Sequence, residues 1–137
     1  MRVLVAALAD HASISQGDKL NVDGIFNMLH APAFPVILPT AALALRLQLE
    51  YEDRNTNHSL EVVIVNQDGK EFAKLQGNIE SPDIPPGQLV TINNIIFYQQ
   101  LVFQAPDKFS VLIRWNGDEA QRLPLHVVAF QAPPPGA

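Results

Sequence analysis

A strict alternation of apolar and polar residues is the feature that most constrains the fold of this chain. In ALALRLQLEY (residues 42–51), leucines occupy every second position from 43 to 49, and Ala44, Arg46, Gln48 and Glu50 occupy the alternate positions. Successive side chains of a strand point to opposite faces, so this pattern is typical of a strand with one buried and one wet face. The dominant period of two predicts β-structure.

A second alternating segment, KFSVLIRWNGD (residues 108–118), predicts a hairpin. It ends in Asn116-Gly117, a pair that favours a two-residue turn because both residues tolerate positive φ. We expect AQRLPLHVVAF (residues 120–130) to be the returning strand. Because Pro124 cannot donate a ladder hydrogen bond, that strand should lie at an edge or bend there.

Two further segments are apolar on both faces. LEVVIV (residues 60–65) is followed by a turn signal at Asp68-Gly69, and QLVTINNIIFYQQLVF (residues 88–103) contains no charged residue. A long uncharged strand pairs readily with other chains when its edge is open. We therefore expect residues 88–103 to be central in a sheet or covered by another subunit. The residues expected to be buried there, in the core or in an interface, are Ile95, Phe97, Tyr98, Leu101 and Phe103.

The breaks between these segments complete the fold prediction. Eleven prolines and seven glycines lie mostly in the breaks, and no segment shows the period of an amphipathic helix. We predict an all-β fold with little or no helix, namely a single antiparallel β-sandwich of roughly eight strands, immunoglobulin-like or jelly-roll-like. The predicted domain covers residues 1–130, and residues 131–137 form a Pro-rich C-terminal tail.

Composition excludes several function classes. The net charge is −5 and the basic residues are scattered, which argues against a nucleic-acid partner. No apolar run approaches about 18 residues, so no membrane span is expected, and we interpret Val3 to Ala9 as a buried first strand rather than as a leader. The absence of cysteine is compatible with a cytoplasmic location. Charged residues make up only 17%, which favours a surface partly covered by a partner or a second copy.

The segment LADHASISQGDKLNVDGIF (residues 8–26) carries residue types found in hydrolases. Asp10, His11, Ser13 and Ser15 are nearly adjacent, but neighbours in an extended chain alternate sides, and the chain has no Gly-x-Ser-x-Gly elbow. We therefore expect Asp10 and the serines to be turn formers, and we predict no catalytic residues and no enzyme activity. The first strand should end in a turn at Gln16-Gly17, and a second strand should begin at Lys19.

Buried and exposed positions follow from this interpretation. We expect Leu20, Val22 and Phe26 to be buried, and His11, Gln16 and Asp18 to be exposed. The candidate exposed loop residues are Asp10, His11 and Asp18, which a partner could meet at one end of the sandwich.

Neither a metal nor a cofactor is predicted. The loop aspartates that could gather a cation come from separate turns, and the histidines lack ligand spacing. The aspartates are Asp10, Asp18, Asp53, Asp83 and Asp107, and the histidines are His11, His30, His58 and His126. Trp115 is in phase with Phe109, Val111 and Ile113, so we expect it in the core rather than on a sugar-binding platform.

Four segments together resemble an uncharacterised bacterial family of small all-β proteins, a domain of unknown function. They are LVAALAD (residues 4–10), GDKLNVDGIFNMLHAPAFP (residues 17–35), LALRLQLEYED (residues 43–53) and APDKFSVLIRWNGDEAQRLPLHVV (residues 105–128). The family pattern is Leu-Ala-Asp, then Gly-Lys-Leu-Asn, then Phe-Pro. Here residues 17–21 carry one extra residue, and Phe34-Pro35 fits. The resemblance implies a sandwich in the bacterial cytoplasm and supplies no catalytic residues.

These observations lead to a functional hypothesis. We expect a non-enzymatic β-sandwich module for interaction or assembly, which self-associates or docks on a protein partner. The alternative is a module that binds a small ligand or carbohydrate, and a hydrolase is the third hypothesis.

Overall fold

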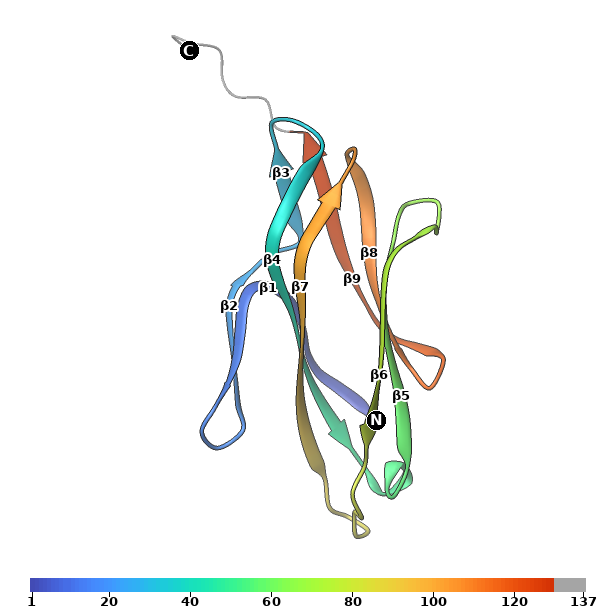
Figure 1. Ribbon diagram of the computed structural model, residues 1–137. Coiled ribbons are helices and arrows are strands. Elements are labelled where there is room, and N and C mark those ends of the chain that lie inside the picture. The colour runs from blue at the N-terminus through green and yellow to red at the C-terminus, as the bar shows by residue number, and fades with distance from the viewer. Residues whose placement is uncertain (130–137) are drawn as a thin grey trace.

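Nine β-strands form two sheets that pack together in the computed structural model, which describes residues 1–129 (Figure 1). The strands are β1 (Arg2–Ser15), β2 (Lys19–Ile25), β3 (Met28–Ala31), β4 (Val36–Leu49), β5 (Asn57–Val65), β6 (Glu71–Glu80), β7 (Val90–Phe103), β8 (Asp107–Trp115) and β9 (Asp118–Ala129). A short 3-10 helix, η1 (Tyr51–Asp53), links β4 to β5. The predicted all-β sandwich is confirmed, with nine strands in the described part instead of eight. The predicted tail 131–137 lies outside the described residues.

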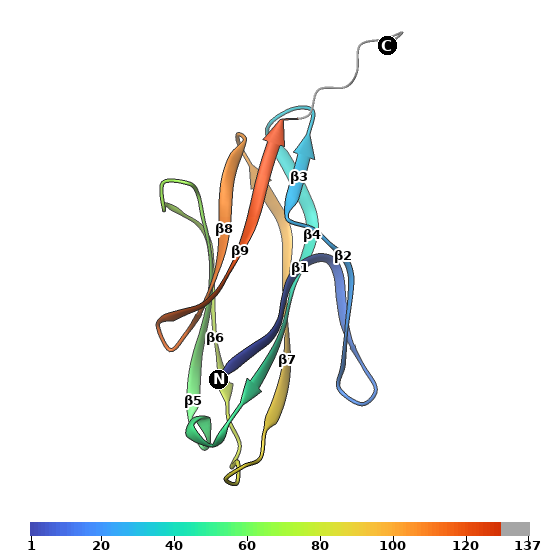
Figure 2. The same cartoon turned by 180° about the vertical axis from the view of Figure 1, so that it is seen from behind.

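The strand order places β7 at the end of a sheet. The four-stranded sheet has the order β2-β1-β4-β7, and the five-stranded sheet has the order β3-β9-β8-β5-β6. The chain changes sheets on both sides of β3, and again between β4 and β5, between β6 and β7, and between β7 and β8. Pairing is antiparallel, as predicted, except that the short strand β3 runs parallel to β9 (Figure 2). No helical segment in residues 1–129 is long and apolar enough to cross a membrane.

The predicted hairpin with its turn at Asn116-Gly117 and its returning strand is confirmed. Trp115 pairs with Asp118 across a two-residue loop, in which Asn116 and Gly117 have φ values of 51° and 89°. Pro124 lies on β9 ahead of the stretch His126–Ala129, where β3 pairs, so its missing N–H faces an open part of the edge.

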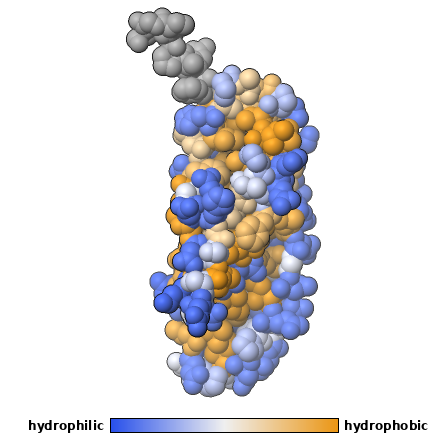
Figure 3. Space-filling model, turned by 60° about the vertical axis from the view of Figure 1, so that its left-hand side comes forward, coloured by the Kyte–Doolittle hydropathy of each residue, from blue (hydrophilic) through white to orange (hydrophobic). Residues whose placement is uncertain are grey.

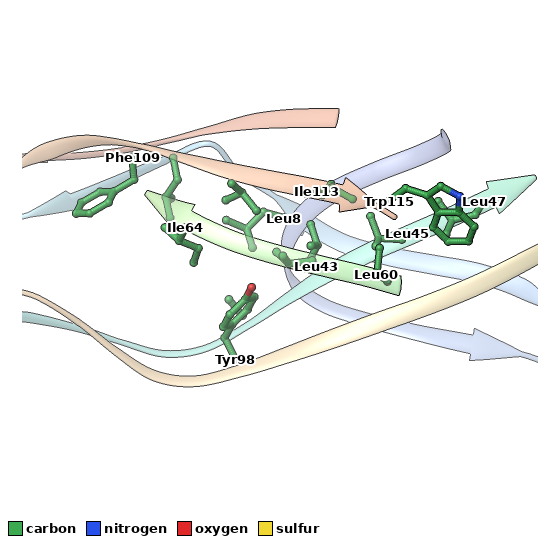
Figure 4. Close-up of a cluster of buried hydrophobic side chains, with 14 of the residues drawn as sticks. Leu8, Leu43, Leu45, Leu47, Leu60, Ile64, Tyr98, Phe109, Ile113 and Trp115 are labelled. Atoms are coloured by element: carbon green, nitrogen blue, oxygen red, sulfur yellow. The ribbon is translucent and has the colours of Figure 1, made fainter. Parts of the chain in front are cut away.

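The core comes from the alternating segments. Leu43, Leu45, Leu47 and Leu49 on β4 are fully buried in the core. The first three face β5 and β8 of the other sheet (Figure 4). Trp115 is 9% exposed, so its predicted place in the core is confirmed. Aliphatic residues of β5 are buried on both faces of the strand, as the segment LEVVIV (residues 60–65) predicted. Val62 and Ile64 join the main core, and Val63 and Val65 form a small cluster with Leu112 on the outer side.

The first strand bends out of the sandwich. β1 pairs with β4 up to Ala9 and with β2 from Ala9 to Ser15, so residues 10–25 form a hairpin beside the four-stranded sheet (Figures 1 and 2). The predicted turn at Gln16-Gly17 and the start of β2 at Lys19 are confirmed. Asp10, Ser13 and Ser15 all lie in β1, so their assignment to a turn was wrong.

The bend also changes the predicted burial. Leu20, Val22 and Phe26 are half-buried instead of buried. Leu20 and Val22 lie on the hairpin, which leaves the space between the two sheets, whereas Phe26 follows the hairpin and packs against the core. The predicted exposure of His11, Gln16 and Asp18 is confirmed.

Candidate functional site

The four edge strands of the sandwich differ in how they are protected against pairing with other chains. Exposed edges are usually guarded by charges, short length or irregular backbone. β3 has only four residues, β2 carries Lys19 and Asp23, and β6 carries Glu71, Lys74 and Glu80. β7 has 14 residues and no charge, and it pairs only with β4. Of the two alternatives expected for this segment, a central place in the sheet is excluded, and cover by another subunit stays a prediction. The free edge of β7 is the candidate site.

The side chains of β7 change faces along the strand. Tyr98 and Phe103 are buried, at 7% and 0% exposure, although a regular strand would place residues 98 and 103 on opposite faces. Gln100 has a φ of 51°, a left-handed conformation that interrupts the alternation between them. Phe97, next to the buried Tyr98, is therefore on the outer face and 65% exposed. Packing in the core does not explain an aromatic residue at this position. Ile95 and Leu101 are half-buried.

An apolar surface continues from β7 across the outer face of the four-stranded sheet. Its most exposed members are Ile25 at 67%, Phe97 at 65% and Ile37 at 54%. Ala9 and Ala42 lie in register between Ile25 and Phe97 and are buried. Figure 3 views this side of the molecule and shows a hydrophobic band bordered by hydrophilic side chains. Contiguous apolar patches of this kind mark interaction sites on soluble domains.

The outer face of the five-stranded sheet is different because ion pairs lie on it. Glu61 accepts a hydrogen bond from Arg114 Nη1 at 2.8 Å and lies 3.5 Å from Lys74 Nζ. The Arg114 guanidinium and the Lys74 ammonium hold the pKa of Glu61 below its usual value. The two outer faces thus differ in character, and the apolar one adjoins β7.

A hollow opens beside the free edge of β7, between the two sheets. It has a volume of about 260 Å³ and is lined by Leu60 on β5, by residues 75–79 on β6, and by Asn94 and Ile96 on β7. Leu75, in this lining, is 42% exposed. A strand added to β7 would lie against the hollow.

The hairpin of residues 10–25 holds the predicted exposed loop residues and is anchored to the same sheet. Asp10 and His11 are exposed on β1, and Asp18 lies in the turn. The backbone carbonyl of Asp18 accepts hydrogen bonds from Arg46 Nη1 at 3.2 Å and from Asn93 Nδ2 at 2.8 Å. Sequence reasoning missed Arg46 and Asn93. The only signal for Arg46 was its place on the wet face of the alternating strand.

A second missed cluster closes the end of the sandwich around His58, which is 4% exposed. The His58 ring stacks on Trp115 at 4.6 Å. Its Nε2 lies 2.8 Å from the Asp53 carbonyl oxygen, and its Nδ1 lies 3.0 Å from Asn116 Nδ2. Since a carbonyl only accepts, Nε2 donates, and Nδ1 is then left to accept from the amide. These contacts satisfy the imidazole as a structural group.

The Asp53 carboxylate belongs to the same cluster and binds the α-ammonium of Met1 at 3.0 Å. Burial acts to raise the pKa of Asp53, but the Glu50 backbone N–H and the Met1 ammonium outweigh it, so the net shift is downward. Within residues 1–129, no three His, Asp or Glu side chains gather in a way that could hold a metal ion.

Comparison with known proteins identifies a family. The family model described as "Family of unknown function (DUF6941)" matches residues 4–128, which is nearly the whole chain. No curated protein matches the chain. The resemblance to an uncharacterised family is thereby confirmed at the level of family. The chain belongs to DUF6941, a family of unknown function.

Proposed function

We propose that this protein is a non-enzymatic interaction module whose β7 edge accepts a strand from a protein partner. The observation that carries the proposal is the contrast between β7, with 14 uncharged residues, and the guarded edges of β2, β3 and β6. Strand addition supplies main-chain hydrogen bonds, and the side chains next to the edge supply specificity. The exposed ring of Phe97 and the hollow beside Ile96 lie on the two faces of this edge.

The partner class follows from charge. The β7 edge offers amides, carbonyls and apolar side chains, and the net charge of −5 disfavours a phosphate backbone. The absence of cysteine and the resemblance to a bacterial family support a bacterial cytoplasmic setting.

A photocrosslinker at the edge tests this function. We expect p-benzoyl-phenylalanine in place of Phe97 to give discrete adducts in bacterial cells, and the adducts should map to an extended segment of the partner. In place of Phe72, an exposed aromatic on the charged β6 strand, the same probe should give severalfold less adduct. Adding Ile95→Lys should remove the Phe97 adducts, because a charge next to the edge opposes pairing. Equal adduct yields at both positions, or adducts that survive Ile95→Lys, would overturn the proposal.

Small-ligand binding is a second candidate function, favoured by one observation. A hollow of about 320 Å³ at the end of the sandwich is lined by Phe72, which is 36% exposed, together with Lys70 and Asp107. The aromatic residue that first suggested a sugar platform, Trp115, is buried. NMR titration with a carbohydrate panel tests this candidate. Saturable shifts confined to the Phe72 hollow would support it, and their absence would eliminate it for those sugars.

A further inference from the structure

We propose that the strand added to β7 is β7 of a second copy of this chain. The two strands would run antiparallel across a twofold axis and join two four-stranded sheets into one continuous sheet. This inference rests on the proposed function and names its partner. Most homo-oligomers are closed by twofold symmetry, in which the same surface of both copies meets itself.

The residue pattern of β7 is self-complementary in one register. When the twofold axis passes beside Ile96, Ile95 of each copy lies opposite Phe97 of the other on the outer face. Pairs of an aromatic and a β-branched residue are favourable across antiparallel strands. The pairing would extend the outer apolar surface across both copies and cover the ring of Phe97, now 65% exposed.

The inner face of the same register involves the hollow between β6 and β7. Ile96 lines this hollow of about 260 Å³ together with Leu60, Leu75 and Ile79. On the twofold axis, Ile96 of the second copy would lie beside the hollow and help to enclose its apolar lining. An uncharged strand suits this site, because a charged side chain there would lose its hydration without gaining an ion pair.

The lack of charge on β7 is compatible with a contact between two copies. Two chains of net charge −5 repel each other, so a stable contact must lie away from their acidic groups. β7 contains no Asp, Glu, Lys or Arg. The nearby Arg46 is already bonded to Asn93 Oδ1 at 2.9 Å and to the Asp18 carbonyl. Two β7 edges can therefore meet without placing like charges opposite each other.

The extent of the contact is limited by backbone geometry. Gln100, with its φ of 51°, interrupts the regular strand, so the edge available for pairing runs over residues 90–99. An axis at Ile96 pairs residues 93–99 of the two copies, so the contact occupies the C-terminal part of this stretch and ends just before Gln100.

Cysteine crosslinking tests the register, because the chain itself has no cysteine. Chains carrying Ile95→Cys and chains carrying Phe97→Cys are mixed in equal amounts and oxidised mildly. We expect the disulfide-linked heterodimer to exceed each homodimer severalfold, since the two positions lie opposite each other only between chains. The matched control is Lys74→Cys, an exposed position on the charged β6 strand outside the lining of the hollow, which should give little crosslinked dimer.

Three other outcomes would overturn the inference. They are a mixture that crosslinks no better than the β6 control, a dominant Ile95→Cys homodimer that reports another register, and homodimers at both positions that report parallel pairing. If the photocrosslinker at Phe97 captures a different protein in those cases, the inference fails and strand addition to β7 stands. If it gives no adducts, both fail.

Discussion

Replacing Phe103 with alanine should lower the free energy of unfolding by about 3–5 kcal/mol, whereas Phe97→Ala should lower it by less than about 1 kcal/mol. Both phenylalanines lie on β7, yet Phe103 is fully buried and Phe97 is 65% exposed. The Phe103 ring stacks on Phe72 at 4.9 Å and meets Phe109 edge-on at 5.2 Å. Its removal would leave a cavity that these rings cannot fill.

Denaturant unfolding of both variants in dilute solution measures the difference. The low concentration keeps any association through Phe97 from adding to the measured stability. Equal losses in the two variants would contradict the change of faces at Gln100, and with it the placement of Phe97 on the outer surface.

Replacing Tyr98 with phenylalanine should stabilise the protein by about 1 kcal/mol at neutral pH. The Tyr98 hydroxyl is buried and has no hydrogen-bond partner within the described residues, and the side chain points into the core near Leu43 and Ile64 (Figure 4). Burying a hydroxyl without a partner costs free energy that the phenyl ring does not incur.

The same hydroxyl should make stability depend on alkaline pH. Burial raises the pKa of Tyr98 from 10.0 to about 12. The folded chain therefore holds this proton more tightly than the unfolded chain. The contribution of this proton to the free energy of unfolding is fully present below pH 10. It falls by about 2–3 kcal/mol as the pH rises to about 12. Unfolding measured across this interval should show the loss in the parent chain but a much flatter profile in Tyr98→Phe.

The matched control is Tyr51→Phe, because Tyr51 is the other tyrosine and is 38% exposed. This variant should keep the alkaline loss. A Tyr98→Phe variant that is less stable than the parent at neutral pH would show that the hydroxyl has a partner in solution.

Features set by neighbouring residues were predictable from the sequence. The leucines of β4, the turn at Asn116-Gly117 and the burial of Trp115 depend on alternation and on positive φ, both of which are local properties. The preference of Pro124 for an unpaired part of an edge is also local, because it follows from a missing N–H.

Features set by strands distant in sequence were not predictable. Residues 88–103 looked like a central strand because they are apolar on both faces, but the neighbour of a strand depends on topology and not on its own pattern. The reversal at Gln100 could not be seen either, because no glycine or proline marks it. The contacts of the Asp18 carbonyl with Arg46 and Asn93 join residues 28 and 75 positions apart. The alternation of apolar and polar residues along one strand does not indicate contacts between residues so far apart in sequence. The candidate site is therefore a property of the fold, although its chemistry was visible in the uncharged segment.

Amide hydrogen exchange along β7 tests the central claim most directly. In dilute solution, alternate amides of residues 93–99 should exchange fast, since they face away from β4 and have no ladder partner. As the protein concentration rises, we predict that these amides become protected together, while the free amides of the charged β6 edge keep exchanging fast. Protection that appears on β6 instead, or edge amides of β7 that exchange equally fast at every concentration, would contradict self-pairing through β7.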